Sequence, residues 1–381
     1  MEIGRKGLAG NGHSSRVWKG DGYLNKADIL NTGIGYFISD FGFDSAIRNR
    51  QWQSMLLDPY SRKINYLRIS VTDRCNLRCC YCMPEEGIPL IPHEAILTYE
   101  EILRIVRVFA AEGISKVRLT GGEPLIRKGI VDFISRLSQI EEIKDLSLTT
   151  NGILLKKLGQ DLKKAGLKRI NISLDSLKKE RFCQITRKDG FDSVWAGVEE
   201  ALRVDLSPIK INMVAIKGIN DDEIESFAQL TLQLPLTIRF IEYMPAGDGE
   251  KWEKDDVLTI PQIKKRIENV GPLIPISSER WDGPAMRFRI EGAMGEIGLI
   301  GPVSNHFCSD CNRLRLTADG KIRTCLFSDE EVDVREILRK GGSDSDLRER
   351  LHVALTAKPA RHHIDTHQFK KCQRNMSAIG G

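Results

Sequence analysis

The stretch that decides the fold runs from Tyr66 to Cys82 and reads YLRISVTDRCNLRCCYC. Its first half is rich in apolar and β-branched residues, which predicts a strand over Tyr66–Thr72. Its second half carries Cys75, Cys79 and Cys82 in the spacing C-x3-C-x2-C. Three thiolates at such spacings can hold a [4Fe–4S] cube by three irons and leave the fourth iron open to a small ligand.

A second triplet lies near the other end of the chain, where Cys308, Cys311 and Cys325 have the spacing C-x2-C-x13-C. Two triplets suggest two open clusters in one chain, and two open clusters suggest two ligands. The other cysteines are interpreted as ordinary small residues. These are Cys80, Cys183 and Cys372.

Disulfides and zinc are the alternatives for these cysteines. Disulfides are disfavoured because we find no secretory signal, and the charge-rich composition is typical of intracellular proteins. Zinc remains an alternative for the second triplet, with His306 as the fourth ligand. It is disfavoured for the first triplet, which lacks the paired C-x2-C layout of zinc ribbons.

The composition is that of an ordinary globular protein. Of 381 residues, 41% are hydrophobic and 29% are charged, and the net charge is +5. We find no apolar run long enough to span a membrane, so a membrane-spanning helix is excluded. The small basic excess does not indicate nucleic-acid binding, although it leaves open a local basic pocket for an anion.

Residues 1–60 differ from the rest of the chain. Gly, Asn, Asp and Ser are scattered there without periodicity, and Met1–Gly20 contains one acidic residue, Glu2, against four basic ones. This composition fits either a transit peptide or a disordered extension. We therefore predict an intracellular protein, placed in the mitochondrial matrix if the extension is a transit peptide and in the cytoplasm otherwise.

From residue 61 onward, β-rich runs alternate with helical patterns, which predicts parallel strands joined by helices. Six units predict an α/β fold, an incomplete (β/α)6 barrel over residues 61–246 with its chemistry at the C-terminal strand ends. An open doubly wound sheet is the alternative. The predicted strands are Tyr66–Thr72, Lys116–Thr120, Leu146–Thr149, Arg169–Leu174, Lys210–Ile216 and Thr237–Tyr243. The predicted helices are Thr98–Glu112, Gly129–Leu137, Leu155–Ala165, Ser193–Arg203 and Asp221–Leu232.

The alternation stops after Ala246. Residues 247–381 are predicted to form a smaller α+β region that carries the second triplet apart from the barrel. Asp319-Gly320 is a hairpin turn signal, and Ser343–Thr356 is predicted to be the last helix. The predicted short antiparallel strands are Arg287–Ile290, Glu296–Leu299, Arg315–Thr317 and Lys321–Cys325.

Beyond the cysteines, strand two ends in the sequence TGGEP over Thr120–Pro124. Paired glycines let a ligand approach the backbone, and Glu123 can accept hydrogen bonds from an ammonium group, although the motif alone also fits a tight turn. The motif C-x3-C-x-Y-C, followed by GGEP, resembles the radical S-adenosylmethionine superfamily. The sequence CSDCNRLR over Cys308–Arg315 and the terminal Gly380-Gly381 are similar to the MoaA-type GTP 3′,8-cyclase family of molybdenum cofactor synthesis. The resemblance extends from about residue 61 to the C-terminus.

The resemblance implies a radical lyase with two [4Fe–4S] clusters and S-adenosyl-L-methionine as cofactors. The first cluster would cleave S-adenosylmethionine to a 5′-deoxyadenosyl radical, which would take hydrogen from C3′ of GTP. The carbon radical would then attack C8 of guanine, with the second cluster holding the base. The product, (8S)-3′,8-cyclo-7,8-dihydro-GTP, precedes cyclic pyranopterin monophosphate in the first step of molybdopterin biosynthesis.

The resemblance also implies roles for individual residues. It assigns S-adenosylmethionine contacts to Tyr81, Gly122, Ser173 and Met244. It assigns GTP contacts to Arg68, Arg118, Thr149, Lys210, Arg313 and Arg315. It assigns catalytic positions to Arg68, Arg313, Arg315, Gly380 and Gly381. Physical chemistry agrees for the arginines, since three phosphates need several fixed cations and guanidinium forks suit them. Arg239 in strand six is a further candidate for this anion site.

In the family, the two terminal glycines reach into the active site, whereas the ordinary expectation for a chain end is fraying. Gly381→Ala is therefore expected to abolish cyclisation, because a side chain would not fit a crowded cleft. Binding of S-adenosylmethionine should remain. Measuring both quantities tests this, and full turnover by the variant would remove the tail from the mechanism.

The family further implies an electron donor, a homodimer, and a separate cyclic pyranopterin monophosphate synthase as the next enzyme. Two other functions remain open. A radical enzyme that modifies peptides or porphyrin precursors would keep the first triplet, but the NRLR segment and the terminal glycines favour a nucleotide. A zinc-stabilised binding module would need neither Tyr81 nor the GGEP motif.

Overall fold

The computed structural model describes residues 55–244, 257–277, 283–362, 364, 372 and 374–379. Residues 1–54 of the predicted extension, the predicted boundary at Ala246, and Gly380 and Gly381 lie outside the described residues. The description below concerns one compact unit, residues 53–381.

The centre of this unit is a row of six parallel strands in which each strand pairs with its neighbour in the sequence. Within the described residues the full sheet has twelve strands and does not close, since Val332–Asp333 (β12) and Leu273–Ile276 (β7) lie at its two ends. The prediction of an incomplete (β/α)6 barrel is confirmed, and the doubly wound alternative, which requires a reversal of strand order, is wrong. The six strands are β1 Tyr66–Ser70, β2 Lys116–Thr120, β3 Asp145–Thr150, β4 Arg169–Ser173, β5 Ile209–Ala215 and β6 Leu236–Glu242.

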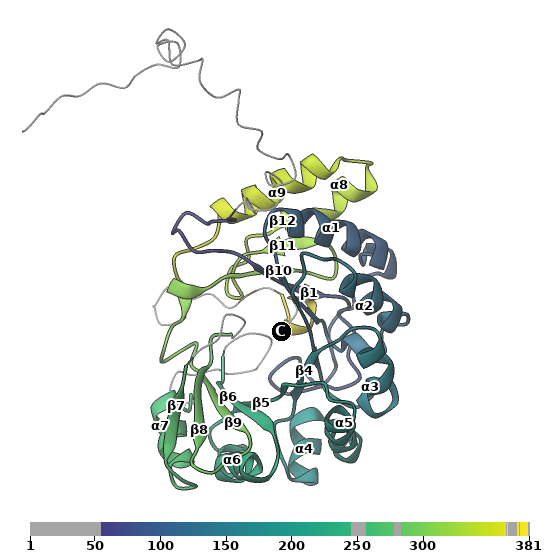
Figure 1. The fold of residues 1–381 in the computed structure, drawn as a ribbon. Coiled ribbons are helices and arrows are strands. Elements are labelled where there is room, and N and C mark those ends of the chain that lie inside the picture. The colour runs from purple at the N-terminus through teal and green to yellow at the C-terminus, as the bar shows by residue number, and fades with distance from the viewer. Residues whose placement is uncertain are drawn as a thin grey trace, which may run out of the picture. The chain divides into compact units, whose positions relative to one another are not determined.

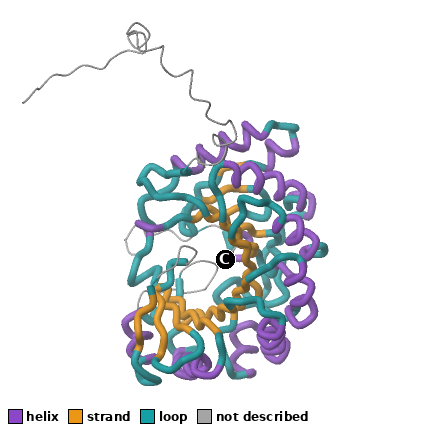
Figure 2. The backbone as a smooth tube through the Cα atoms, viewed as in Figure 1, coloured by secondary structure: helices purple, strands orange, loops and turns teal. Residues whose placement is uncertain are grey.

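Helices connect these strands and lie on the outside of the curved sheet (Figures 1 and 2). The five predicted helices are present to within a few residues, and the last of them begins with a 3-10 turn over Asp221–Glu223. Helix α4 was not predicted, because its polar segment has only three buried residues. The helices are α1 Tyr99–Ala111, α2 Ile130–Ser138, α3 Leu155–Lys164, α4 Lys179–Thr186, α5 Phe191–Arg203 and α6 Ile224–Gln233.

Helix α1 shows how the sequence determines these elements. The Thr98 hydroxyl accepts from the Glu101 backbone N–H while the Glu101 carboxylate accepts from the Thr98 N–H, so the helix begins with a capping box. Ile102, Val106 and Phe109, spaced by one helical turn, are fully buried against the sheet.

The strands of the C-terminal part extend the barrel sheet at both edges. The four predicted short strands are present as the antiparallel pairs β8–β9 and β10–β11, and the second pair is the hairpin predicted at Asp319-Gly320. However, β9 also pairs in parallel with β6, and β10 pairs in parallel with β1. The expectation that the second triplet lies apart from the barrel is therefore wrong, because a short strand pattern does not reveal which edge the strand joins. The strands are β7 Leu273–Ile276, β8 Met286–Ile290, β9 Glu296–Ile300, β10 Arg313–Leu316, β11 Lys321–Arg323 and β12 Val332–Asp333.

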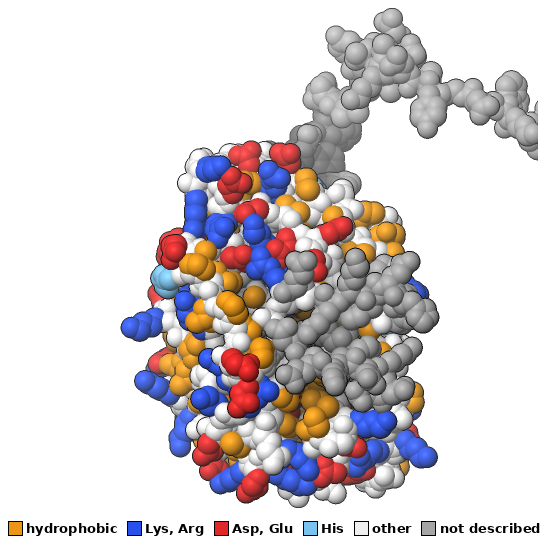
Figure 3. Space-filling model, turned by 180° about the vertical axis from the view of Figure 1, so that it is seen from behind, with side chains coloured by type: hydrophobic (Ala, Val, Ile, Leu, Met, Phe, Trp, Pro, Cys, Tyr) orange, Lys and Arg blue, Asp and Glu red, His pale blue; other side chains and the backbone are white. Residues whose placement is uncertain are grey.

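The remaining helices are α7 Ile260–Ile267, α8 Arg335–Arg339, α9 Asp344–Thr356 and α10 Met376–Ile379. Helix α9 is the helix predicted over Ser343–Thr356 and packs against α1. The expectation that it is the last helix is wrong, because the short helix α10 follows it. Helices α7, α8 and α10 were not predicted. Within the described ranges, the helices are too short or too polar to cross a bilayer. Basic and acidic side chains are interspersed on the face shown in Figure 3.

Candidate active site

Both cysteine triplets line one cavity of about 330 Å³ at the C-terminal ends of the barrel strands. Thr120, Thr150 and Ser173 line it from the ends of β2, β3 and β4. The second triplet reaches the cavity because β10, which follows Cys311, pairs alongside β1. This is the edge at which β/α barrels carry their chemistry.

The first triplet lies in the loop that follows β1. The Arg187 guanidinium donates to the Met83 carbonyl at 2.9 Å, and the Cys80 N–H donates to the Ile185 carbonyl at 2.9 Å. These bonds fix the loop to the end of α4. Burial raises the pKa of the Cys75 thiol to about 12. A metal group that binds here must therefore displace that proton.

The second triplet has a more positive environment. The buried Lys358 Nζ lies 3.6 Å from Cys311 Sγ and donates to the carbonyls of Arg313 and Thr324 at 3.0 and 2.7 Å. It thus ties the segment of Cys311 to that of Cys325. Burial raises the pKa of Cys311, but the Arg313 and Lys358 cations outweigh it and leave the pKa at about 7. Sequence reasoning missed Lys358, because no motif marks a lone lysine 47 residues away.

The six cysteines of the triplets are free thiols. Within the described ranges, no three or more His, Cys, Asp or Glu side chains are grouped to hold a single metal ion. His306, the fourth ligand of the zinc alternative, directs its Nδ1 to the Pro302 carbonyl at 2.9 Å and to His362 Nε2 at 3.2 Å. The arrangement of ligands around a [4Fe–4S] cluster differs from that around a single metal ion, because each thiolate binds a separate iron.

Three arginines form a row across adjacent strands on one wall of the cavity. In the sheet register, Arg68 of β1 lies opposite Arg118 of β2 and Arg315 of β10. All three line the cavity, and Arg118 and Arg315 are buried. Burial and the neighbouring cations lower the pKa of Arg315 to about 10 and also lower that of Arg68. Like charges packed this closely favour an anion between them.

The pKa of Tyr66 shows the effect of the same positive charges. Its burial raises the pKa of the phenol, but Arg118, Arg68 and Lys116 outweigh this and bring the pKa down to about 8. Arg313, two residues before Arg315, stacks over Phe307 with 4.8 Å from guanidinium to ring centroid. The wall is therefore strongly cationic at neutral pH.

Several residues that line this cavity carry buried polar atoms without hydrogen-bond partners. Among the described residues, five of the buried side-chain polar atoms that lack a hydrogen bond belong to residues lining it. Such atoms are rare in native proteins unless a ligand or water satisfies them. They are Tyr66 Oη, Thr149 Oγ1, Asn212 Oδ1, Thr324 Oγ1 and Ser377 Oγ.

The structure brings together most of the residues singled out in the sequence. The cavity is lined by Arg68, Tyr81, Arg118, Gly122, Thr149, Ser173, Met244, Arg313 and Arg315, together with both triplets. Lys210 instead lines a small adjacent hollow, and Arg239 lines both spaces. Their individual roles remain predictions. Gly380 and Gly381 follow α10, whose residues Met376 and Ser377 line the cavity.

Gly122 is required by the packing of two loops. Its N–H donates to the Thr72 carbonyl at 2.7 Å, which brings the GGEP segment against the loop that carries the first triplet. A Cβ atom at Gly122 would overlap the Arg74 carbonyl and lie 2.7 Å from the Asp73 carbonyl oxygen. The glycine thus sets the position of the first triplet.

Gly122→Ala is accordingly expected to destabilise the protein by about 3 kcal/mol or more, because the clash is with backbone that cannot move aside. Gly341→Ala is the matched control. Its φ is +76° but no atom lies within 4 Å, so it should lose only roughly 1–2 kcal/mol. Denaturant unfolding of both variants, with an iron count, tests this. Equal losses for the two variants would contradict the packing role of Gly122.

Three buried glutamates hold the loops around the cavity. Glu123 accepts from the Thr150 hydroxyl and the Asn151 N–H at 2.7 and 2.6 Å. Glu223 accepts from Leu177 N–H at 2.7 Å, and Glu242 accepts from the backbone N–H groups that follow β9. Protein donors reach both Glu123 oxygens and Glu123 is not among the residues that line the cavity, so its role as an ammonium acceptor stays a prediction.

Comparison with known proteins shows a consistent set of relatives. The radical SAM superfamily model matches residues 69–231, and the molybdenum cofactor synthesis C model matches residues 236–364. The chain is 53% identical to a GTP 3′,8-cyclase of Thermodesulfovibrio yellowstonii, over 85% of this chain and 99% of that protein. It is 49% identical to a GTP 3′,8-cyclase of Heliobacterium modesticaldum, over 86% of this chain and all of that protein.

Among solved structures, Streptococcus suis SuiB bound to S-adenosylmethionine has a similar fold. The TM-score is 0.52 at 16% sequence identity, over 81% of this chain and 75% of that one. At this identity the likeness concerns the fold alone. It agrees with the incomplete barrel described above.

Proposed function

Because this chain belongs to the GTP 3′,8-cyclase family of the radical S-adenosylmethionine superfamily, we propose that its cavity holds both reactants, each beside one cysteine triplet. The reaction is conversion of GTP to (8S)-3′,8-cyclo-7,8-dihydro-GTP, the first step of molybdenum cofactor biosynthesis. The observation that carries the proposal is that both triplets and the arginine row line one cavity.

The residues fit two [4Fe–4S] clusters and S-adenosylmethionine. Cys75, Cys79 and Cys82 would hold one cluster, and Cys308, Cys311 and Cys325 would hold the other. When bound, these groups supply a one-electron reduction that cleaves S-adenosylmethionine and makes a radical able to take hydrogen from carbon. The unpartnered polar atoms of the cavity support the presence of a polar ligand.

Different residues of the cavity wall would contact the two reactants. Tyr81, Gly122, Ser173 and Met244 would contact S-adenosylmethionine beside the first triplet. The arginine row would bind the phosphates of GTP, with Arg313 and Thr149 nearby and with Lys210 and Arg239 as outlying cations. Fixed guanidinium groups orient the sugar toward the first triplet, and this alignment is the protein's main contribution to rate.

The C-terminus would complete the enclosure. Ser70 Oγ donates to the Ser377 carbonyl at 3.4 Å, and Ile379 is buried. The chain segment that leads to Gly380 and Gly381 is thus held beside β1. We propose that these two glycines take part in the reaction by excluding water from a reactive radical.

Membership of the family is the basis on which we propose the partners and the compartment of this protein. GTP is the substrate, and we propose an electron donor, a homodimer, and a separate synthase that consumes the product. No role for nucleic acid is proposed. The relatives described above are bacterial proteins, which favours the cytoplasm over the mitochondrial matrix for this chain.

The direct test is product formation by the anaerobically reconstituted enzyme with S-adenosylmethionine and dithionite. We expect the cyclised nucleotide with GTP and almost none with ATP, which differs only in the base. Failure to form it with GTP, under conditions in which S-adenosylmethionine is cleaved, would overturn the substrate and favour another radical enzyme.

A further inference from the structure

A hydrogen bond joins two loops that line the cavity and are distant in sequence. The Tyr81 hydroxyl donates to Asp175 Oδ2 at 2.6 Å across a separation of 94 residues. Tyr81 lies in the loop after β1, whereas Asp175 follows β4, and β2 and β3 lie between these strands in the sheet. Both residues line the cavity. The bond therefore fixes the triplet loop to the opposite side of the strand ends.

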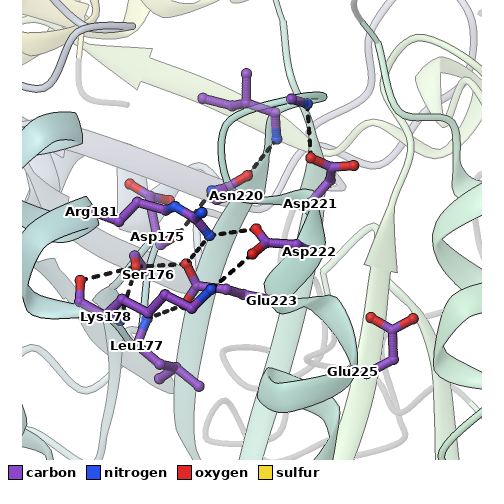
Figure 4. A network of polar contacts seen from close by, with 12 residues as sticks. Asp175, Ser176, Leu177, Lys178, Arg181, Asn220, Asp221, Asp222, Glu223 and Glu225 are labelled. Carbon is purple, nitrogen blue, oxygen red and sulfur yellow. Dashed lines mark hydrogen bonds and ion pairs between the residues drawn. The ribbon is translucent and has the colours of Figure 1, made fainter.

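Asp175 is held rigidly for this contact. Its other carboxylate oxygen accepts from the Val214 N–H at 2.8 Å, and its carbonyl accepts from the buried Asn220 side chain at 2.8 Å. Figure 4 shows Asp175 and Asn220 within one polar network between the segments that follow β4 and β5. These two hydrogen bonds fix the Asp175 side chain and backbone. The carboxylate oxygen that accepts from Tyr81 is therefore held in one position.

The same network secures the residues that follow Asp175. Glu223 is buried and accepts from the Ser176 hydroxyl at 2.8 Å and from the Leu177 N–H at 2.7 Å. Arg181 donates to Glu223 at 2.8 Å and also contacts Asp222 at the outer edge. The network thus runs from a solvent-facing ion pair inward to the aspartate that meets Tyr81 (Figure 4).

We propose that Asp175 is a positioning residue for S-adenosylmethionine, acting through the Tyr81 hydroxyl to hold the ring in one orientation against the cofactor. This rests on the proposed function of the cavity. A tyrosine without this bond could still cover the site, but it would sample several orientations. Ordering the ring before the ligand arrives reduces the entropy lost on binding. It also keeps cleavage of S-adenosylmethionine coupled to cyclisation.

The test is a double-mutant cycle of Tyr81→Phe and Asp175→Asn in the reconstituted enzyme. Each single variant should raise the Kd of S-adenosylmethionine about tenfold, leave the Kd of GTP unchanged, and raise the ratio of 5′-deoxyadenosine to cyclised nucleotide. The double variant should be no worse than either single variant. Asp192→Asn, which removes an exposed partner of Lys179 outside this network, is the matched control and should change neither the Kd of S-adenosylmethionine nor the product ratio.

Additive effects would overturn the proposal, since the two groups would then act independently. If Asp175→Asn does not fold, Tyr81→Phe alone tests the proposal, because this substitution removes only the hydroxyl that donates to Asp175. An unchanged Kd and an unchanged product ratio in Tyr81→Phe would overturn the proposal. Failure of the proposed function is distinguishable, because the unmodified enzyme would then form no cyclised nucleotide.

Discussion

Arg68→Ala is expected to lower kcat/KM for GTP by about 10²- to 10³-fold. Arg68 is the middle of the arginine row, opposite Arg118 on one side and Arg315 on the other. Losing one partner of a buried charge-assisted contact typically costs about 2–5 kcal/mol, and each 1.4 kcal/mol is about tenfold. Steady-state kinetics with varied GTP, at saturating S-adenosylmethionine, measure the effect.

Two further variants separate charge from geometry. Arg68→Lys keeps the charge but loses the planar fork, so an intermediate kcat/KM is expected. Arg339→Ala removes an arginine that pairs with Glu101 on the surface, and it should leave kcat/KM nearly unchanged. Wild-type kinetics in Arg68→Ala would show that the row does not bind the phosphates.

Cys79→Ala and Cys311→Ala are expected to affect the cleavage of S-adenosylmethionine differently. Each should reduce the iron content from about eight to about four per chain, because each removes a ligand of one cluster. Cys79→Ala should abolish formation of 5′-deoxyadenosine. Cys311→Ala should retain slow cleavage of S-adenosylmethionine but lose its dependence on GTP. Iron analysis and chromatography of 5′-deoxyadenosine measure both effects.

Cys80→Ala is the matched control for these substitutions. Cys80 is adjacent to Cys79, but the structure uses its backbone N–H, which donates to Ile185. Its iron content and cleavage rate should remain at the wild-type level. If Cys80→Ala loses a cluster while Cys79→Ala does not, the ligand assignment of the first triplet is wrong.

Local sequence patterns predicted the barrel because barrels repeat a local unit. Strand β2 matches its predicted bounds at both ends, and α1 begins one residue after the predicted start at Thr98, which is its N-cap. Each unit folds onto its sequence neighbour, so periodicity and capping residues carry most of the information. Short elements such as α4 and α10 bury too few residues to leave a comparable pattern.

Long-range pairing could not be predicted in this way. The alignment of Arg68 with Arg315 depends on β10 joining β1 in a specific register, and no local pattern encodes that choice. The residues that hold the site in place could not be predicted from the sequence for the same reason. Lys358, Asp175 and Glu242 act through backbone groups and side chains that are brought close only by the fold. The cysteines were recognisable because their spacing is itself local.

The most direct test of two clusters serving two reactants in one cavity is made anaerobically on the reconstituted wild-type chain. Iron and sulfide are counted, and 5′-deoxyadenosine is measured with S-adenosylmethionine and dithionite in the presence and absence of GTP. We predict about eight irons per chain and cleavage that increases with GTP. About four irons, or cleavage indifferent to GTP, would contradict the assignment of the second triplet.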